Sequence, residues 1–145
     1  MASGRCERLS ELPAAMKDAL DAARRGVMTT VDREGRPHAV PVVFAVHDQD
    51  LVTPIDRKPK TGKTLGRLRN LERDPRVALL ADRWSEEWTE LAWVMIRGRA
   101  SVQSSSRSVS EVEAIIARYP EYRDTLEGSD VIRIVPEQIL WWSWA

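Results

Sequence analysis

The sequence has little that could build a disulfide or a metal-bound framework. It contains one cysteine, Cys6, and two histidines, His38 and His47. A single cysteine cannot close an intrachain disulfide, and neither histidine has a cysteine or a second histidine at metal-ligand spacing. We therefore expect no metal site, and the lone thiol fits a reducing interior.

Long apolar runs are also missing. No segment approaches the roughly 20 apolar residues that cross a bilayer, and the stretch from Met1 to Leu12 has no hydrophobic run of signal-peptide type. The expected protein is cytoplasmic and has no membrane partner.

The chain carries no excess charge of either sign. Its 22 lysines and arginines balance 22 aspartates and glutamates, so the whole molecule has no electrostatic attraction to nucleic acid, and no nucleic-acid partner is expected. With 145 residues, 43% of them hydrophobic and 30% charged, the composition predicts one soluble domain over residues 1–145.

The usual nucleotide-binding and hydrolytic motifs are absent too. Thr61-Gly62-Lys63-Thr64 resembles the end of a P-loop, but Arg57 stands where that loop needs its first glycine. No G-x-G-x-x-G and no G-x-S-x-G occurs. The sequence therefore offers no side-chain constellation for catalysis, and no catalytic residue is assigned.

What the sequence does contain is a series of short strands with few helices. Apolar periodicity predicts a helix over about residues 10–24, a second helix with Leu65, Leu68 and Leu71 that ends near Asp74-Pro75, and a third that starts at a Ser110/Glu113 capping box and stops at Pro120. Six strands are predicted, at about 27–31, 37–46, 51–54, 77–81, 91–102 and 131–144. The first three are expected to form a meander, and the whole a mainly β, six-stranded antiparallel barrel with peripheral helices.

Two of these strands are apolar on both faces. Along Val40 to Phe44 and along Leu91 to Ile96, successive side chains point to opposite faces, yet the side chains on both faces are apolar. A barrel interior covers only one face, and three short helices leave part of the other face bare. This pattern predicts a homodimer.

Positive charge is concentrated in one segment. Seven basic and two acidic residues lie between Asp56 and Arg73, and this stretch enters the second predicted helix, whose exposed N–H groups favour anions. Lys60 and Thr61 are the residues that we expect to bind phosphate. A solvated helix face is the alternative explanation.

Tryptophan is unusually frequent, with six residues against one phenylalanine. Some of these rings belong to the core, but Trp84 and Trp88 flank an acidic loop and are the least explained by core packing. They are available to shield a flat ring system.

Several segments together resemble the pyridoxamine-phosphate-oxidase-like, FMN-binding split barrels. The resemblance lies in Met28–Asp32, Gly35–Phe44, Leu51–Thr53, Arg57–Thr61, Leu68–Leu71, Asp74–Val77, Trp93–Val94 and Gly98–Ala100. Within this family the chain is most similar to the branch of coenzyme F420-dependent oxidoreductases. It lacks the carboxy-terminal extension of the longer pyridoxamine phosphate oxidases.

The resemblance implies a homodimeric split β-barrel that binds a flavin or deazaflavin between its subunits and acts on a small-molecule substrate. Carried over by position, the phosphate region would be bound by Thr53, Lys58, Lys60 and Thr61, with Arg67 and Asn70 as weaker candidates. The ring would be lined by Val40, Pro41 and Val42, and Trp88 would come from the partner subunit.

The resemblance leaves the cofactor open between F420 and FMN. FMN has one phosphate, whereas F420 adds a phosphodiester and a polyglutamate tail, so seven clustered cations favour F420, although each exposed cation contributes only about 0.2–1 kcal/mol. In either case the cofactor would carry the hydride chemistry. A non-catalytic F420 or flavin carrier is an alternative, and a protein that uses its basic helix on nucleic acid is a more distant one.

Overall fold

The computed structural model describes residues 1–55, 66–126 and 129–145. The strands are β1 (Ala2–Cys6), β2 (Gly26–Val31), β3 (Pro37–Val42), β4 (Ala45–His47), β5 (Asp50–Pro54), β6 (Arg76–Arg83), β7 (Ala92–Gln103) and β8 (Val131–Ser143). The α-helices are α1 (Ala14–Ala22), α2 (Gly66–Arg73), α3 (Val109–Arg118) and α4 (Arg123–Leu126). Short 3-10 turns are η1 (Leu9–Glu11), η2 (Trp88–Glu90), η3 (Ser105–Arg107) and η4 (Pro120–Tyr122).

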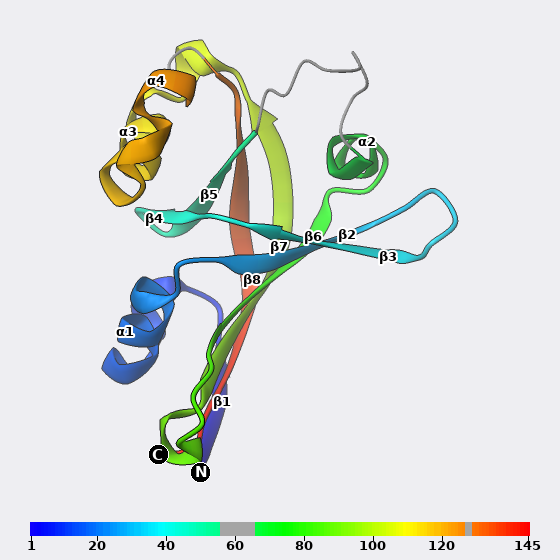
Figure 1. Cartoon of the computed structure of the whole chain (residues 1–145). Helices are drawn as coiled ribbons and strands as arrows, with labels where there is room; N and C mark the ends of the chain where they lie inside the picture. The colour runs from blue at the N-terminus through cyan, green and yellow to red at the C-terminus, as the bar shows by residue number, and fades with distance from the viewer. Residues whose placement is uncertain (56–65, 127–128) are drawn as a thin grey trace.

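The architecture is mainly β and antiparallel, as predicted, with helices at its periphery (Figure 1). The described residues form eight strands rather than the predicted six, in the order β3-β2-β6-β7-β8-β5-β4, with β1 paired to β8. The sheet does not close into a barrel, because β3 and β4 lie at the two ends of this path. The two strands that were not predicted are β1 and β4.

Strand β4 arises from a break in the run from Pro37 to Val46. The β2–β3 hairpin is confirmed, with Val31 opposite Pro37, but β3 ends at Val42 and Phe44 turns into the core with none of its surface exposed. The following strand β5 pairs with β4 and β8, not with β3. The predicted three-stranded meander is therefore wrong. All five residues of β5 are buried, because β5 lies between β8 and β4 in the sheet and not at an edge beside β3.

The other unpredicted strand is the amino-terminal strand β1. Its residues are mostly exposed, so no alternation of apolar and polar side chains marks it. It pairs with the last strand, from Ala2 opposite Ser143 to Cys6 opposite Ile139. Gly4 lies under the ring of Trp141, where an added Cβ would be 2.6 Å from the nearest ring carbon. The absence of a side chain there lets the tryptophan cover the strand.

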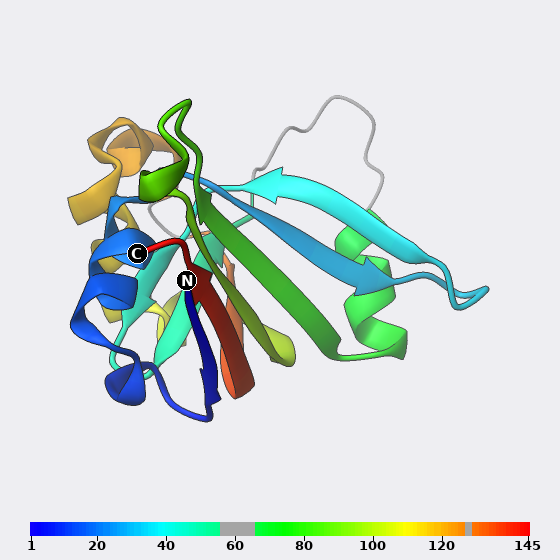
Figure 2. The same ribbon diagram turned by 90° about the horizontal axis from the view of Figure 1, so that it is seen from below.

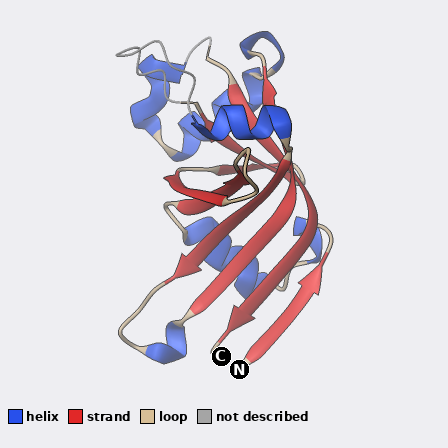
Figure 3. Ribbon diagram, turned by 90° about the vertical axis from the view of Figure 1, so that its right-hand side faces the viewer, coloured by secondary structure: helices blue, strands red, loops and turns tan. Residues whose placement is uncertain are grey.

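The main core lies between the sheet and α1. The predicted helix over residues 10–24 is found as η1 and α1, with Pro13 between them. Leu9, Leu12, Met16 and Leu20 are all buried, and they pack against side chains such as Met28, Leu79, Val94, Ile96 and Ile139 from the same face of the sheet. In Figure 3, which looks at the side of the sheet opposite α1, that helix lies behind the strands.

A second, smaller cluster lies under α3 and α4. It packs Val112, Ile115, Tyr119 and Leu126 against β4 and β5. The predicted capping box at Ser110 is wrong: α3 begins at Val109, and Ser110 sits inside the helix with its hydroxyl bonded to Glu111. The predicted stop is confirmed, because α3 ends at Arg118 just before Pro120.

Within the described part of the chain, no helix has the length and apolar character that a membrane span requires.

A bulge in the long pair of strands β7 and β8 requires glycine. The pairing shifts between Arg97 and Gly98, and Gly98 faces Pro136, which has no N–H to donate. A Cβ at position 98 would lie 2.0 Å from the carbonyl oxygen of Val135. This distance is too short for any contact, so the backbone would have to shift to make room for the Cβ.

We therefore expect Gly98→Ala to lower the free energy of unfolding by at least about 2–3 kcal/mol, measured by urea denaturation. Gly66→Ala is the matched control, because its Cβ would lie 3.4 Å from the nearest atom, an ordinary contact with His38. Equal stability of the two variants would contradict this account of the bulge.

Candidate functional site

A cavity of about 260 Å³ lies where β2, β3, β5, α2 and η4 approach one another. The figures show α2 on one side of β5 and the α3–α4 segment on the other (Figures 1 and 2). The lining side chains come from both sides: Arg25, Pro41, Val42, Val43, Thr53, Pro54, Arg67 and Tyr122. Arg25 directly precedes β2 and Val43 directly follows β3, and the others come from β3, β5, α2 and η4.

The floor of this cavity contains an unsatisfied hydroxyl. Thr53 is 1% exposed, and its Oγ1 has no hydrogen-bond partner among the described residues. Burying a hydroxyl without a partner costs about 1–3 kcal/mol, so most buried hydroxyls have a hydrogen-bond partner. A ligand oxygen in the cavity would satisfy it.

The charge of the cavity is positive. Two of its lining residues, Arg25 and Arg67, are cations, and none of the described lining residues is a carboxylate. Val42, Val43 and the two prolines supply the apolar part of the wall. A cavity with guanidinium groups, a free hydroxyl and apolar walls fits an anionic group attached to an apolar ring.

Four of the residues predicted from the resemblance therefore lie together: Pro41, Val42, Thr53 and Arg67. Val40, also predicted to line the ring, is not among the lining residues. It lies opposite Met28 and packs against the main core. The predicted phosphate ligands Lys58, Lys60 and Thr61 lie outside the described residues.

Asn70 lies on another side of α2 and holds the helix in place. It is 5% exposed, and its Nδ2 donates to Thr30 Oγ1 at 2.9 Å and lies 3.4 Å from His38 Nδ1. Its Oδ1 accepts from Arg73 Nη2 at 3.1 Å. These contacts attach α2 to the β2–β3 hairpin and so fix the side of the helix that carries Arg67.

Trp88 lies at the other end of the molecule from α2. It is 62% exposed on the turn between β6 and β7, which Figure 1 shows beside the two chain termini. The backbone N–H of Trp144 donates to Leu91 O at 3.0 Å, so the carboxy-terminal end of the chain lies beside this turn. Within one chain, Trp88 is therefore remote from the cavity.

Arg25 and Tyr122 are lining residues that sequence reasoning missed. Arg25 directly follows the helix predicted over about residues 10–24, and Tyr122 stands in a segment without periodicity. No local signal marks either residue as part of a site, because the fold alone brings them beside β3 and β5.

A basic groove of about 850 Å³ runs between α2 and the tip of the β2–β3 hairpin. Its arginines are Arg33, Arg36, Arg69 and Arg73, with Asp32 and Glu72 beside them. Arg36 is paired with Asp32 and Glu34. Arg33 and Arg69 make no ion pair with a described residue, so part of the groove's charge is available to an anion.

The carboxyl end of α2 is fixed by Asp74. The pKa of this carboxyl falls from 3.8 to about 2, because the Arg76 side chain, and then the Arg76 backbone N–H, donate hydrogen bonds to it. Since the pKa is lower in the folded chain, the contribution of this contact to stability is present above about pH 4 and is lost as the pH falls toward 2.

We expect Arg76→Gln to raise the pKa of Asp74 back toward its ordinary value, measured by an NMR pH titration of the carboxyl carbons. Asp32, whose pKa is lowered chiefly by the backbone N–H of Arg36, should keep its value. An unchanged Asp74 titration would show that Arg76 does not hold this carboxyl.

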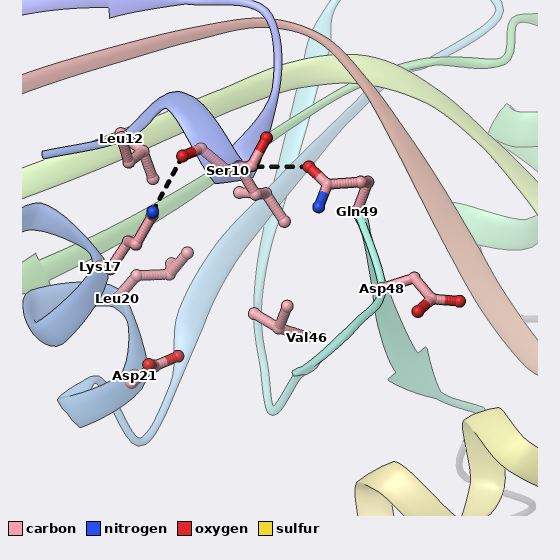
Figure 4. A pocket seen from close by; sticks show the side chains of 9 residues that line it. Ser10, Leu12, Lys17, Leu20, Asp21, Val46, Asp48 and Gln49 are labelled. Atoms are coloured by element: carbon pink, nitrogen blue, oxygen red, sulfur yellow. Dashed lines mark hydrogen bonds between the residues drawn. The ribbon is translucent and has the colours of Figure 1, made fainter. Parts of the chain in front are cut away.

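A further crevice of about 200 Å³ lies between α1 and the β4–β5 turn (Figure 4). Two of its polar side chains are already engaged: Lys17 Nζ donates to Ser10 O at 2.8 Å, and Gln49 Oε1 accepts from the Ser10 N–H at 3.1 Å. These bonds attach η1 to the sheet. We interpret this crevice as a packing feature.

The described residues include no group of three or more His, Cys, Asp or Glu side chains placed to hold a metal ion.

Comparison with known proteins decides the family. Residues 12–143 match the family described as Pyridoxamine 5'-phosphate oxidase. The chain belongs to this family. No curated protein sequence matches the chain.

Solved structures share the fold at low sequence identity. The conserved hypothetical protein Rv2991 from Mycobacterium tuberculosis has a TM-score of 0.75 and 21% identity, over 96% of this chain and 88% of its own. An FAD-binding protein from Mesorhizobium loti has a TM-score of 0.67 and 19% identity, over 97% of both chains. HutZ, the heme storage protein from Vibrio cholerae, has a TM-score of 0.67 and 20% identity, over 85% of this chain and 89% of its own.

Proposed function

We propose that this family member binds coenzyme F420 in the cavity between β3, β5 and α2, as a homodimer, and transfers a hydride between the deazaflavin and an organic acceptor. The observation that carries the proposal is the buried, unpartnered hydroxyl of Thr53 in a cavity that also contains Arg67 and no described carboxylate. This donor set fits the phosphate group of a ring cofactor.

The bound ring would supply the hydride chemistry, and the chain would supply position and electrostatics. Thr53 and Arg67 would bind the phosphate group, and Pro41 with Val42 would contact the ring. Lys58, Lys60 and Thr61 are kept as proposed phosphate ligands on the strength of the resemblance. This division accounts for a site without a nucleophile or an acid–base pair among its described residues.

The basic groove favours F420 over FMN. It lies on the same helix as Arg67, and Arg33 and Arg69 in it have no described ion-pair partner. FMN has a single phosphate and would leave these cations unused, whereas the tail of F420 adds several carboxylates. Each partly exposed contact contributes only about 0.2–1 kcal/mol, so the preference is expected to be modest and to weaken with salt.

The homodimer is proposed from an apolar row on the outer face of the sheet. Neighbouring strands place five side chains in register across β3, β2, β6, β7 and β8: Pro41, Val27, Leu80, Met95 and Leu140. Val27 is 40% exposed and Leu80, Met95 and Leu140 are half-buried, and this face is the one opposite α1 (Figure 3). A second copy would cover the row.

This row also connects the dimer to the cofactor cavity. Pro41 belongs to both, because it ends the row and lines the cavity. A second copy seated on the row would therefore lie at the mouth of the cavity. We propose that the partner's Trp88, which is exposed, covers the cofactor ring there.

Fluorescence titration with F420 tests the proposed function. We expect the wild type to bind F420 with a micromolar dissociation constant, and Thr53→Val, which keeps the shape but removes the hydroxyl, to weaken binding about tenfold. Thr29→Val is the matched control on a partly exposed strand position outside the cavity. Absence of F420 binding by the wild type would refute the cofactor assignment.

FMN is the second candidate, and the similarity to an FAD-binding protein favours it. The same titration with FMN decides between them, and yellow flavin absorbance in the purified protein would support FMN.

The similarity to a heme storage protein favours a non-catalytic carrier, which would bind F420 and show no turnover with quinones, nitroaromatics or enones.

A further inference from the structure

The cavity has a second cationic wall that the proposed cofactor contacts leave unused. Arg67 and Thr53 belong to the α2 and β5 side, whereas Arg25 and Tyr122 belong to the side of the α3–α4 segment. Arg25 is exposed and makes no ion pair or hydrogen bond with a described residue. The cavity therefore offers two separate positions for an anionic group.

The backbone on both sides of Arg25 is held firmly. Arg24 Nη2 donates to Arg118 O at 3.2 Å, its guanidinium lies 4.5 Å from the centre of the Tyr119 ring, and its carbonyl accepts from Tyr119 Oη at 2.7 Å. After Arg25, Gly26 pairs with Val42 in the hairpin. The Arg25 side chain thus starts from a fixed point.

The ring of Tyr122 is positioned by the same cluster. It meets the Tyr119 ring edge to face, with centroids 6.4 Å apart and an angle of 83°, a favoured geometry for aromatic pairs. The Tyr119 hydroxyl in turn binds Arg24. One set of contacts therefore holds both lining residues of this wall, a flat ring beside a guanidinium.

We propose that Arg25 binds the carboxylate of a small, planar organic acid, with the Tyr122 ring against its conjugated part, and that this acid is the hydride-exchanging substrate. The proposal rests on the proposed function. A guanidinium binds a carboxylate through two parallel hydrogen bonds.

The chemistry balances for a conjugated acid. The carbon–carbon double bond accepts a hydride at its β carbon and a proton from water at its α carbon, and it becomes a single bond. The reduced deazaflavin, which supplies the hydride, loses two electrons and ends oxidised.

Binding of cinnamate and of its neutral amide, cinnamamide, tests the proposal by ligand-observed NMR with the F420-saturated protein. Wild type is expected to bind cinnamate about tenfold more tightly than cinnamamide, and Arg25→Gln to remove this preference while the F420 dissociation constant changes less than about twofold. Arg123→Gln, a neighbouring cation that does not line the cavity, should leave both ligands unaffected.

Equal binding of acid and amide by wild type, or no binding of cinnamate, would overturn the proposal while F420 binding stands. The same holds if Arg25→Gln binds cinnamate as wild type does. Failure of wild type to bind F420 is a separate result: it removes the proposed function and the role of the acid as a hydride acceptor, even if cinnamate binding without cofactor still depends on Arg25.

Discussion

Arg67→Glu is expected to weaken F420 binding by at least about 100-fold. Hydrogen bonds to a charged group contribute about 1.5–3 kcal/mol, and reversing the charge adds repulsion with the phosphate, so the loss exceeds about 2.7 kcal/mol. Arg67 is half-buried and lines the same cavity as Thr53. Salt screens its charge less there than at the open surface. Fluorescence titration with F420 measures the effect.

Lys17→Glu is the control for Arg67→Glu, because it changes the net charge equally. Lys17 is exposed in α1, on the side of the sheet opposite the apolar row (Figure 3). It should bind F420 as wild type does, and urea denaturation of both variants verifies that they are folded. Equal loss of binding in the two variants would mean that overall charge, not the cavity, attracts the cofactor.

Met95→Glu is expected to convert the homodimer into monomers. Met95 stands inside the apolar row, between Leu80 and Leu140, and a two-fold axis would place two unpaired glutamates in the covered interface. Burying an unpaired charge costs several kcal/mol. Sedimentation equilibrium should give twice 16.5 kDa for the wild type and 16.5 kDa for the variant.

Loss of the dimer should also weaken cofactor binding, because the row ends at Pro41 in the cavity wall. Val109→Glu is the control: Val109 is a 61% exposed valine at the start of α3, outside the row. It should leave the mass unchanged. A wild type that sediments at 16.5 kDa would contradict the dimer and the role of the partner's Trp88.

Much of the fold was predictable because its elements have strong local signals. The Leu9, Leu12, Met16 and Leu20 spacing marks the helix that covers the core, and Asp32 to Gly35 marks the β2–β3 hairpin. The additional strands had no such signal. β1 is exposed, so its own side chains do not mark it as a strand, and it forms only because it pairs with β8. The break at Phe44, which separates β3 from β4, lies in an apolar run that contains no turn residue.

The site was predictable only where it coincides with the resemblance. Pro41 and Val42 belong to one segment of the family pattern and Thr53 to another, Arg67 directly precedes the segment Leu68–Leu71, and the structure gathers all four around one cavity. Two other residues of the resemblance do not line the cavity: Val40 packs against the main core, and Asn70 is occupied by Thr30, His38 and Arg73. Arg25 and Tyr122 are 97 residues apart, and only tertiary contacts bring them together.

A crystal structure of the protein with bound F420 tests the central claim most directly. The account predicts the phosphate group at Thr53 and Arg67, the ring against Pro41 and Val42, and a second copy on the row that contains Met95, with the partner's Trp88 over the ring. A ligand bound away from this cavity, or a cavity that faces no second copy, would contradict it.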